Sequence, residues 1–310
     1  MSRPMNRTAG LALLGATLIW GFVPVSTRHV VGTLEPGHIL LARFVVGAAV
    51  GAVALGLLHA PAPPRRLVVR AVGLGLLGQL GFNVPLAYGI QYVASGTAAL
   101  VSSMSPVFMA LLAVPLLHER LRPRVVLGLT LALTGSAIVV AVGGGEVSLG
   151  SDQILGSLLM LCSAILWAVY SVIVKPWLGP IPPTSIPMVG SIAGLPLMLV
   201  LGAGGFIPAL GNLEPPGWLA VALFTLGASV IAPILWAVGL QGGAAARAGM
   251  FLYLVPLVGV ASGAILLGEP VGSGTVAGGA LVLLGVAVAT LPFAASWRRR
   301  GLSLRERPAR

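Results

Sequence analysis

The chain has 310 residues, of which 57% are hydrophobic and only 8% are charged, and its formal net charge is +11. A water-soluble domain carries roughly a quarter charged residues, so this composition excludes a soluble protein and makes lipid the solvent for most of the surface. The basic residues lie at the ends of apolar stretches and in the C-terminal tail, which argues against a nucleic-acid-binding face. The single cysteine, Cys162, excludes a disulfide framework and a cysteine-rich zinc site.

Apolar segments long enough to cross a membrane follow one another along the whole chain, since a spanning helix needs about 20 mainly apolar residues. We identify ten, at residues 9–31, 37–59, 67–91, 94–117, 123–143, 153–174, 184–204, 216–240, 245–268 and 272–295. The boundaries at 91–94 and 240–245 require very short turns. The sequence therefore predicts an all-α membrane protein with ten transmembrane helices.

The distribution of charge orients these spans, because Lys and Arg are enriched in cytoplasmic loops. With both termini in the cytoplasm, the outside retains only Arg28, while Arg43 lies within the second span. Five of the seven acidic residues then lie outside: Glu35, Glu146, Asp152, Glu214 and Glu269. We expect a multi-pass protein of the bacterial inner membrane with both termini in the cytoplasm.

The two halves of the sequence resemble each other. An offset of 150 residues matches Gln91 with Gln241, Pro106 with Pro256 and Glu119 with Glu269, and an offset of 147 matches Trp20 with Trp167 and Arg28 with Lys175. Each half has five spans, so the second half enters the membrane in the opposite orientation, an arrangement common among transporters. We predict repeats at 1–146 and 147–296, followed by a basic cytoplasmic tail at 297–310.

Several short motifs occur in a fixed order along the chain. They are Leu18-Ile19-Trp20-Gly21, Arg43, Ala94-Ser95-Gly96-Thr97-Ala98-Ala99-Leu100, Ser105-Pro106, His118-Glu119-Arg120-Leu121 and Leu267-Gly268-Glu269-Pro270. With the ten spans, this set resembles the EamA family of the drug/metabolite transporter superfamily, and within it the amino-acid exporters. The resemblance implies a basket-shaped bundle of two inverted five-helix repeats around a central cavity. It also implies export of amino acids or related metabolites.

Polar and aromatic residues within the spans are the candidate substrate-binding residues, since ligand sites are mostly apolar with a few orienting polar groups. They are Trp20, Arg43, Gln79, Asn83, Tyr88, Trp167, Trp236 and Tyr253. Arg43 has two interpretations, because a charge inside a membrane usually faces a cavity or a partner. It either holds a substrate carboxylate, or it caps helix ends or pairs with Glu35.

Other residues are candidates for gating or for helix bending. Arg28 and Lys175 lie at opposite membrane faces and are either gating charges or side chains that snorkel to headgroups. Pro85, Pro106 and Pro256 are expected to kink their helices. Glu119 and Glu269 end helices, where negative charge is unfavourable, so each should have a partner or cap the next span.

No Asp or Glu lies between the ends of any span, and the histidines are not clustered. Neither a metal site nor a cofactor is expected, an intramembrane enzyme is disfavoured, and carboxylate-based proton coupling has no support. Phosphorylated cargo would require several deep cations, and only Arg43 is available. We expect an exporter of small metabolites, foremost neutral or aromatic amino acids, that acts by alternating access, with the lipid bilayer and the substrate as its partners. A monomer would suffice. Export of drugs, nucleosides or sugars, and passive facilitation, remain alternatives.

Overall fold

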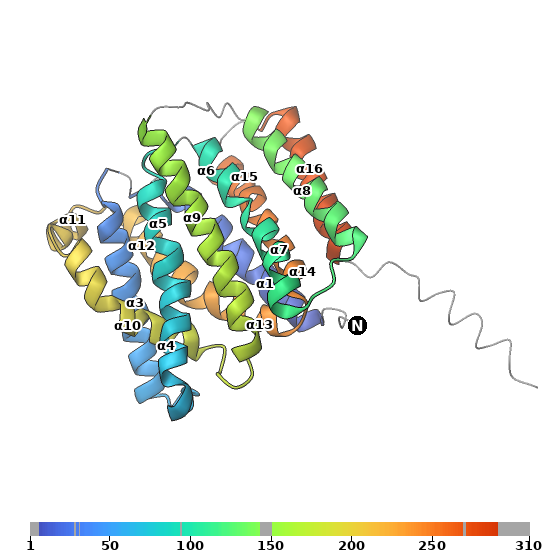
Figure 1. Ribbon diagram of the computed structural model, residues 1–310. Helices are drawn as coiled ribbons and strands as arrows, with labels where there is room; N and C mark the ends of the chain where they lie inside the picture. Colours follow the sequence, from blue (N-terminus) through green and yellow to red (C-terminus); the bar gives the residue numbers. More distant parts are fainter. Residues whose placement is uncertain are drawn as a thin grey trace, which may run out of the picture.

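The computed structural model describes residues 6–27, 29–30, 32–93, 95–142, 151–268 and 271–290. Helices are the only regular elements of this part of the chain, and they pack side by side in a bundle (Figure 1). Among the described residues, nine helical segments are long and apolar enough to span a membrane, and the shorter apolar helix Pro123–Val139 makes a tenth. The prediction of an all-α membrane protein with ten spans is confirmed.

The first half forms spans one to five, and three of these spans are interrupted. The elements are α1 (Arg7–Gly21) and α2 (Val23–Thr27); α3 (Pro36–Gly56); η1 (Arg65–Leu67), α4 (Val68–Leu76), the π-helical η2 (Leu77–Gly81) and α5 (Phe82–Gly89); α6 (Ser95–Ser102) and α7 (Ser105–Leu117); and α8 (Pro123–Val142).

The second half forms spans six to ten with a similar pattern of interruptions. The elements are α9 (Ser151–Val174) and η3 (Lys175–Trp177); α10 (Ser185–Gly202) with the short α11 (Phe206–Gly211); α12 (Pro215–Ala222), the π-helical η4 (Leu223–Ile231) and α13 (Ala232–Gln241); α14 (Ala245–Gly249), η5 (Met250–Tyr253) and α15 (Leu254–Leu267); and α16 (Ser273–Thr290).

The outward surface of the bundle is strongly apolar. Val69, Val200 and Ile265 expose 87%, 81% and 80% of their surface. Water would penalise each of these side chains by an amount proportional to its exposed apolar area, whereas lipid tails accept them without cost. The exposure pattern therefore agrees with a bundle whose perimeter faces the bilayer.

The interruptions of the third and fourth spans fall at positions equivalent to those of the eighth and ninth spans. The 150-residue offset places η2 on residues 227–231, within η4. It also places the break between α6 and α7 beside the 3₁₀ turn η5 of the ninth span. Pro106 is the second residue of α7 and Pro256 the third of α15, so each proline directly follows its break, where its missing N–H costs no helical hydrogen bond.

The fifth and tenth spans, α8 and α16, pack directly against each other through glycines (Figure 1). A Cβ atom at Gly128 would lie 2.6 Å from the carbonyl oxygen of Gly285, and one at Gly135 would lie 2.5 Å from that of Gly278. Only glycine permits this approach, as in other membrane helix pairs. The offset pairs Gly128 with Gly278 and Gly135 with Gly285, so the contact is reciprocal, as a two-fold axis between inverted halves requires.

Candidate functional site

Five aromatic side chains from four spans of both halves form one group, here called the aromatic cluster: Trp20, Phe82, Trp167, Tyr170 and Trp236. The ring centroids of Trp20 and Trp167 are 5.3 Å apart and nearly perpendicular. Trp236 lies 5.7 Å from each of these two rings, and Phe82 lies 4.8 Å from Trp167. These spacings are those of favourable aromatic pairs. The matched tryptophans of the first and sixth spans therefore meet each other between the halves.

The indole N–H groups of the three tryptophans differ in their partners. Trp20 Nε1 donates to the carbonyl oxygen of Ala228 at 3.1 Å, and Trp236 Nε1 donates to Ser171 Oγ at 3.2 Å. Trp167 Nε1 is buried and has no hydrogen-bond partner within the described chain. A buried donor without an acceptor costs free energy, so Trp167 carries a donor that a ligand could satisfy.

A second group, here called the polar chain, consists of Arg43, Gln79, Asn83 and Ser229. Arg43 Nε donates to Ser229 Oγ at 2.6 Å, and Gln79 Nε2 donates to the Ser229 carbonyl oxygen at 3.4 Å. Asn83 Nδ2 donates to the Gln79 carbonyl oxygen at 2.7 Å. Because Gln79 and Ser229 are matched by the 150-residue offset, the polar chain crosses between equivalent positions of the two halves.

Pro233, just after the π-helical η4, explains why the Ser229 carbonyl oxygen is available to this polar chain. In an α-helix, the Ser229 carbonyl would accept from the N–H of residue 233, but Pro233 has none. Ser229 Oγ donates to the carbonyl oxygen of Phe224, five residues earlier, at 2.7 Å. A π-helical turn changes the backbone pairing locally and is frequent at functional sites. Asn83 Oδ1, at the end of the polar chain, is buried without a partner in the part of the chain that the structure describes.

The aromatic cluster and the polar chain are adjacent. Ala228, whose carbonyl oxygen accepts from Trp20, directly precedes Ser229, whose hydroxyl accepts from Arg43. In the third span, Phe82 of the aromatic cluster likewise directly precedes Asn83 of the polar chain. The third and eighth spans thus place aromatic side chains beside a row of polar groups.

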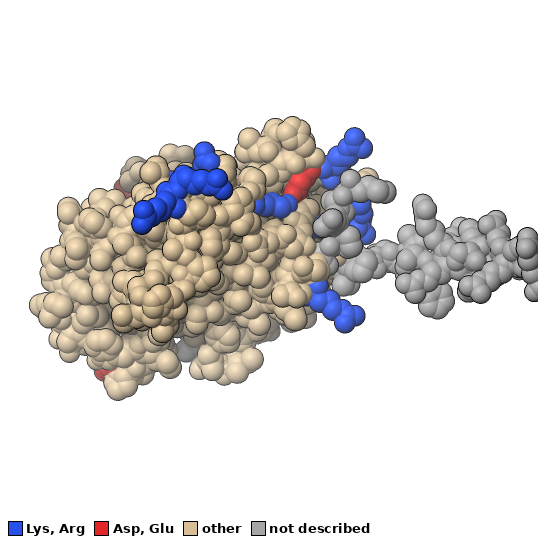
Figure 2. All heavy atoms as spheres, turned by 90° about the horizontal axis from the view of Figure 1, so that it is seen from below, with Lys and Arg blue, Asp and Glu red and all other residues tan. Residues whose placement is uncertain are grey.

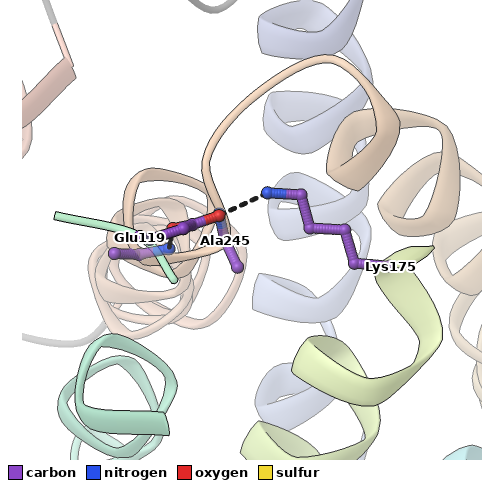
Figure 3. A network of polar contacts seen from close by, with 4 residues as sticks. Glu119, Lys175 and Ala245 are labelled. Carbon is purple, nitrogen blue, oxygen red and sulfur yellow. Dashed lines mark hydrogen bonds and ion pairs between the residues drawn. The ribbon is translucent and has the colours of Figure 1, made fainter. Parts of the chain in front are cut away.

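A separate network, drawn in Figure 3, joins Glu119, Lys175 and the start of α14. It lies on the N-terminal face, by which we mean the side of the bundle where α1 begins (Figure 1). Glu119 Oε1 accepts from Lys175 Nζ at 2.5 Å and from the Ala245 N–H at 2.9 Å, and Oε2 accepts from the Ala246 N–H at 3.4 Å. A carboxylate is favourable at a helix N-terminus. Of the alternatives that the sequence leaves open for Glu119, the structure shows an ion pair together with a cap, and the capped helix is α14 of the ninth span rather than the next span.

The structure brings together some of the predicted site residues and separates others. Trp20, Trp167 and Trp236 lie in the aromatic cluster, and Arg43, Gln79 and Asn83 lie in the polar chain. Tyr88 instead packs beside Leu40 and Phe44 of the second span. Tyr253 is buried beside residues of the fifth and tenth spans. Neither tyrosine belongs to the two central groups.

The remaining predicted residues are placed as follows. Pro85 lies inside α5, shortly after the π-helical η2. Arg43 hydrogen-bonds to Ser229, and no pairing with Glu35 occurs among the described residues. Arg28 and Glu269 lie outside the described residues. Their roles in gating and at helix ends stay predictions, as do the repeat boundaries at 146 and 147.

Phe82, Tyr170 and Ser229 belong to the central groups, although sequence reasoning does not select them. Ser229 could have been found, because the offset that pairs the two halves matches it with Gln79. Tyr170 follows Trp167 by three residues and so lies on the same helical face. Phe82 carries no comparable signal beyond its position beside Asn83.

The spans, the inverted halves and the central site define a polytopic membrane transporter rather than an enzyme. The model of the EamA-like transporter family matches residues 7–141 and 154–291. The chain belongs to this family, and the two matches correspond to its two halves.

Individual relatives agree with this class. The chain is 28% identical over 300 residues to the aromatic amino acid exporter YddG of Ancylobacter novellus, covering 93% of this chain and 99% of that one. It is 30% identical over 277 residues to an uncharacterized transporter of Archaeoglobus fulgidus, covering 86% and 93%. A probable terminal-alkyne amino-acid exporter of Streptantibioticus cattleyicolor is 29% identical over 250 residues, covering 79% and 81%. A solved structure described as "Crystal structure of protein" superposes with a TM-score of 0.76 at 25% identity, covering 91% and 98%.

Proposed function

We propose that this transporter exports small metabolites, foremost neutral and aromatic amino acids, by alternating access. The observation that carries the proposal is the aromatic cluster, in which matched tryptophans of the two halves meet. A substrate held there would touch both halves at once. Movement of one half relative to the other could then expose it first to one side of the membrane and next to the other.

The chemistry of the aromatic cluster suits an apolar or aromatic side chain. Trp20, Trp167 and Phe82 present ring faces and edges, which favour offset or perpendicular contact with another ring. The polar groups beside them are few, as in sites where apolar area supplies affinity and polar atoms supply orientation. The names of two relatives, an aromatic amino acid exporter and a probable terminal-alkyne amino-acid exporter, support this substrate class.

Contacts between the two halves gather at the N-terminal face. Glu119 of the first half binds Lys175 and the start of α14 in the second half. The Asn6 N–H donates to the Gly242 carbonyl oxygen at 3.4 Å, which adds a second link between the halves. We take these contacts as those that separate when the site opens toward this face.

The N-terminal face is proposed to be the cytoplasmic one, in the bacterial inner membrane. Figure 2 shows the molecule from below, the side on which α1 begins, and several Lys and Arg side chains but few carboxylates are visible there. The described basic residues near this face are Arg7, Arg65, Arg66, Arg70, Arg120, Arg122, Arg124, Lys175 and Arg247. Positive charge of this kind favours the cytoplasmic side.

The test is counterflow with the purified chain in liposomes. Vesicles loaded with unlabelled phenylalanine should accumulate labelled phenylalanine from outside, and the rate should saturate with its concentration. Leucine and tryptophan should compete. Flux that rises linearly and is not stimulated by internal substrate would indicate a passive channel, and absence of protein-dependent flux for a broad amino-acid panel would reject the proposal. Reaction of single cysteines in the termini with an impermeant reagent, in intact and in opened cells, tests the orientation.

A further inference from the structure

Arg43 is a charged residue deep within a span that has no carboxylate partner among the described residues. Helix α3 starts at Pro36, and Arg43 follows seven residues later. This separation corresponds to ~10 Å along the helix axis. The ion pair between Glu119 and Lys175 lies elsewhere, at the N-terminal face. An intramembrane charge is costly and is normally offset by an opposite charge or an aqueous cavity. The charge of Arg43 is therefore not offset by any carboxylate of the described residues, and an anionic ligand could offset it.

The guanidinium group is held by one edge only. Its Nε–H donates to Ser229 Oγ, and within the described chain its two Nη groups have no hydrogen bond. A guanidinium group has five N–H donors in a rigid planar fork. With Nε occupied, the pair of Nη groups is left as an end-on fork, which matches the two oxygens of a carboxylate.

Ser229 is fixed in turn by the π-helical segment. Its hydroxyl hydrogen is donated to the Phe224 carbonyl, so an oxygen lone pair remains for Arg43 Nε. Its backbone carbonyl accepts from Gln79 Nε2. The bond to Phe224 fixes the orientation of the hydroxyl that accepts from Arg43 Nε, and this restricts the rotation of the guanidinium group.

We infer that Arg43 binds the carboxylate of the transported molecule and that Ser229 is the residue that positions it. This inference rests on the proposed transport function and names the chemical class of the substrate as monocarboxylates with an apolar side chain. The apolar part would contact the aromatic cluster, since Ala228 and Ser229 are consecutive residues that hold Trp20 and Arg43. A single deep cation suits one carboxylate and excludes dianionic phosphate esters as preferred cargo.

The first measurement compares acids with their neutral amides. Quenching of tryptophan fluorescence or thermal shift would report binding to the purified chain of L-phenylalanine against L-phenylalaninamide, L-leucine against L-leucinamide, and 3-phenylpropanoate against 3-phenylpropanamide. Charge-assisted hydrogen bonds predict that each acid binds roughly tenfold or more tightly than its amide. Equal affinities across all three pairs would overturn the inference without any variant.

The second measurement uses variants. Arg43→Gln should bring the acid-to-amide affinity ratio to about one, chiefly by weakening the acid. Arg43→Lys should restore part of the ratio, because an ammonium keeps the charge but not the planar fork. An unchanged ratio in a folded Arg43→Gln variant would overturn the inference.

Ser229 provides a test that does not remove the charge. Ser229→Ala should lower the ratio several-fold, and Ser229→Thr should preserve it because the hydroxyl is retained. Ser262→Ala is the matched control, since Ser262 is also buried in a span but donates only to the carbonyl oxygen of Gly259 in its own helix. If the Ser229→Ala variant kept the wild-type acid-to-amide affinity ratio, Ser229 would not be the residue that positions Arg43. This test does not depend on whether Arg43→Gln folds.

Transport assays separate this inference from the proposed function. Acid-selective binding without protein-dependent flux would reject the transport of these compounds and leave the carboxylate site standing. Flux of phenylalanine and phenylalaninamide with the same KM would support transport and reject the carboxylate site.

Discussion

Glu119 Oε1 receives hydrogen bonds from both the Lys175 ammonium group and the N–H of Ala245, at 2.5 and 2.9 Å. One carboxylate thereby joins the end of the fourth span, the end of the sixth and the start of the ninth (Figure 3). Only 11% of the Glu119 side chain and 20% of the Lys175 side chain are exposed. The pair is therefore partly shielded from solvent, which reduces the screening of its attraction by salt.

Glu119→Ala should lower the free energy of unfolding by about 1–3 kcal/mol, because it removes a helix cap and leaves Lys175 without its partner. Thermal unfolding in detergent would measure this loss. Lys175→Ala should cost less, about 1 kcal/mol, because the cap on α14 remains. Arg66→Ala, which removes an exposed charge from the same face, is the control. If Glu119→Ala and Lys175→Ala had additive effects in the double variant, the pair would not be energetically coupled.

Removal of the same carboxylate should also favour opening of the N-terminal face. With Cys162, which is exposed, replaced by serine, a cysteine placed at Ala246 should react slowly with a polar maleimide, because Ala246 is buried and bonded to Glu119. Glu119→Gln should accelerate this reaction several-fold, because the amide no longer attracts Lys175. A rate that does not depend on residue 119 would contradict the assignment of these contacts to the closed state.

Trp20→Ala and Trp167→Ala should each reduce counterflow of phenylalanine about tenfold or more, since a buried aromatic contact contributes on the order of 1–3 kcal/mol. Insertion and folding should be retained, as judged by gel filtration. Trp218→Ala is the matched control, because Trp218 is 49% exposed on the eighth span and lies outside the aromatic cluster. Wild-type flux in well-folded versions of both variants would remove the aromatic cluster from the transport pathway.

Trp167→Phe and Trp236→Phe should differ in stability. The Trp236 variant leaves buried Ser171 without its indole donor, which should cost about 1–2 kcal/mol. The Trp167 variant removes a buried donor that has no acceptor in the described chain, so the decrease in the free energy of unfolding should be smaller. Thermal unfolding compares the two, and an equal loss would indicate that Trp167 Nε1 has a partner, such as a bound water molecule.

Gly135→Ala should destabilise the bundle by about 2 kcal/mol or more, because its Cβ would lie 2.5 Å from the Gly278 carbonyl oxygen and would force α8 and α16 apart. Gly73→Ala is the contrasting variant, since nothing lies within 4 Å of a Cβ at that position of α4. There the gain in helix propensity should stabilise the chain by about 0.5–1 kcal/mol. Unfolding in detergent with increasing SDS measures both, and similar values would refute the close-contact argument.

The number, type and approximate bounds of the spans could be predicted from the sequence because the thickness of the bilayer fixes the length of every apolar segment. The internal repeat likewise matches Trp20 with Trp167, and the two rings are in contact. The interruptions were harder to predict: Pro85 indicated a break in the third span, but the π-helical turn lies before it, at Leu77–Gly81.

Which side chains meet across the bundle could not be predicted from hydropathy. Tyr88 and Tyr253 lie within spans, as expected, yet they face other helices than Trp20 does. Hydropathy gives the depth of a residue, whereas its direction depends on helix rotation and tilt, which packing determines. The partners of Glu119 depend in the same way on the arrangement of three spans that are distant in sequence.

The reciprocal glycine contacts between α8 and α16 have a consequence for the origin of the architecture. An interface in which residue i of one unit meets residue j of the other, and j meets i, is the isologous contact of a symmetric homodimer. Here Gly128 meets Gly285 and Gly135 meets Gly278, at positions that the two halves share. Two separate copies of one five-helix unit, inserted in opposite directions, could make the same contact. Covalent linkage of the halves fixes their opposite orientations in the membrane. It also allows the two halves to differ in sequence, so that the Arg43–Ser229 pair occurs once. In a dimer of identical subunits, the same pair would occur twice.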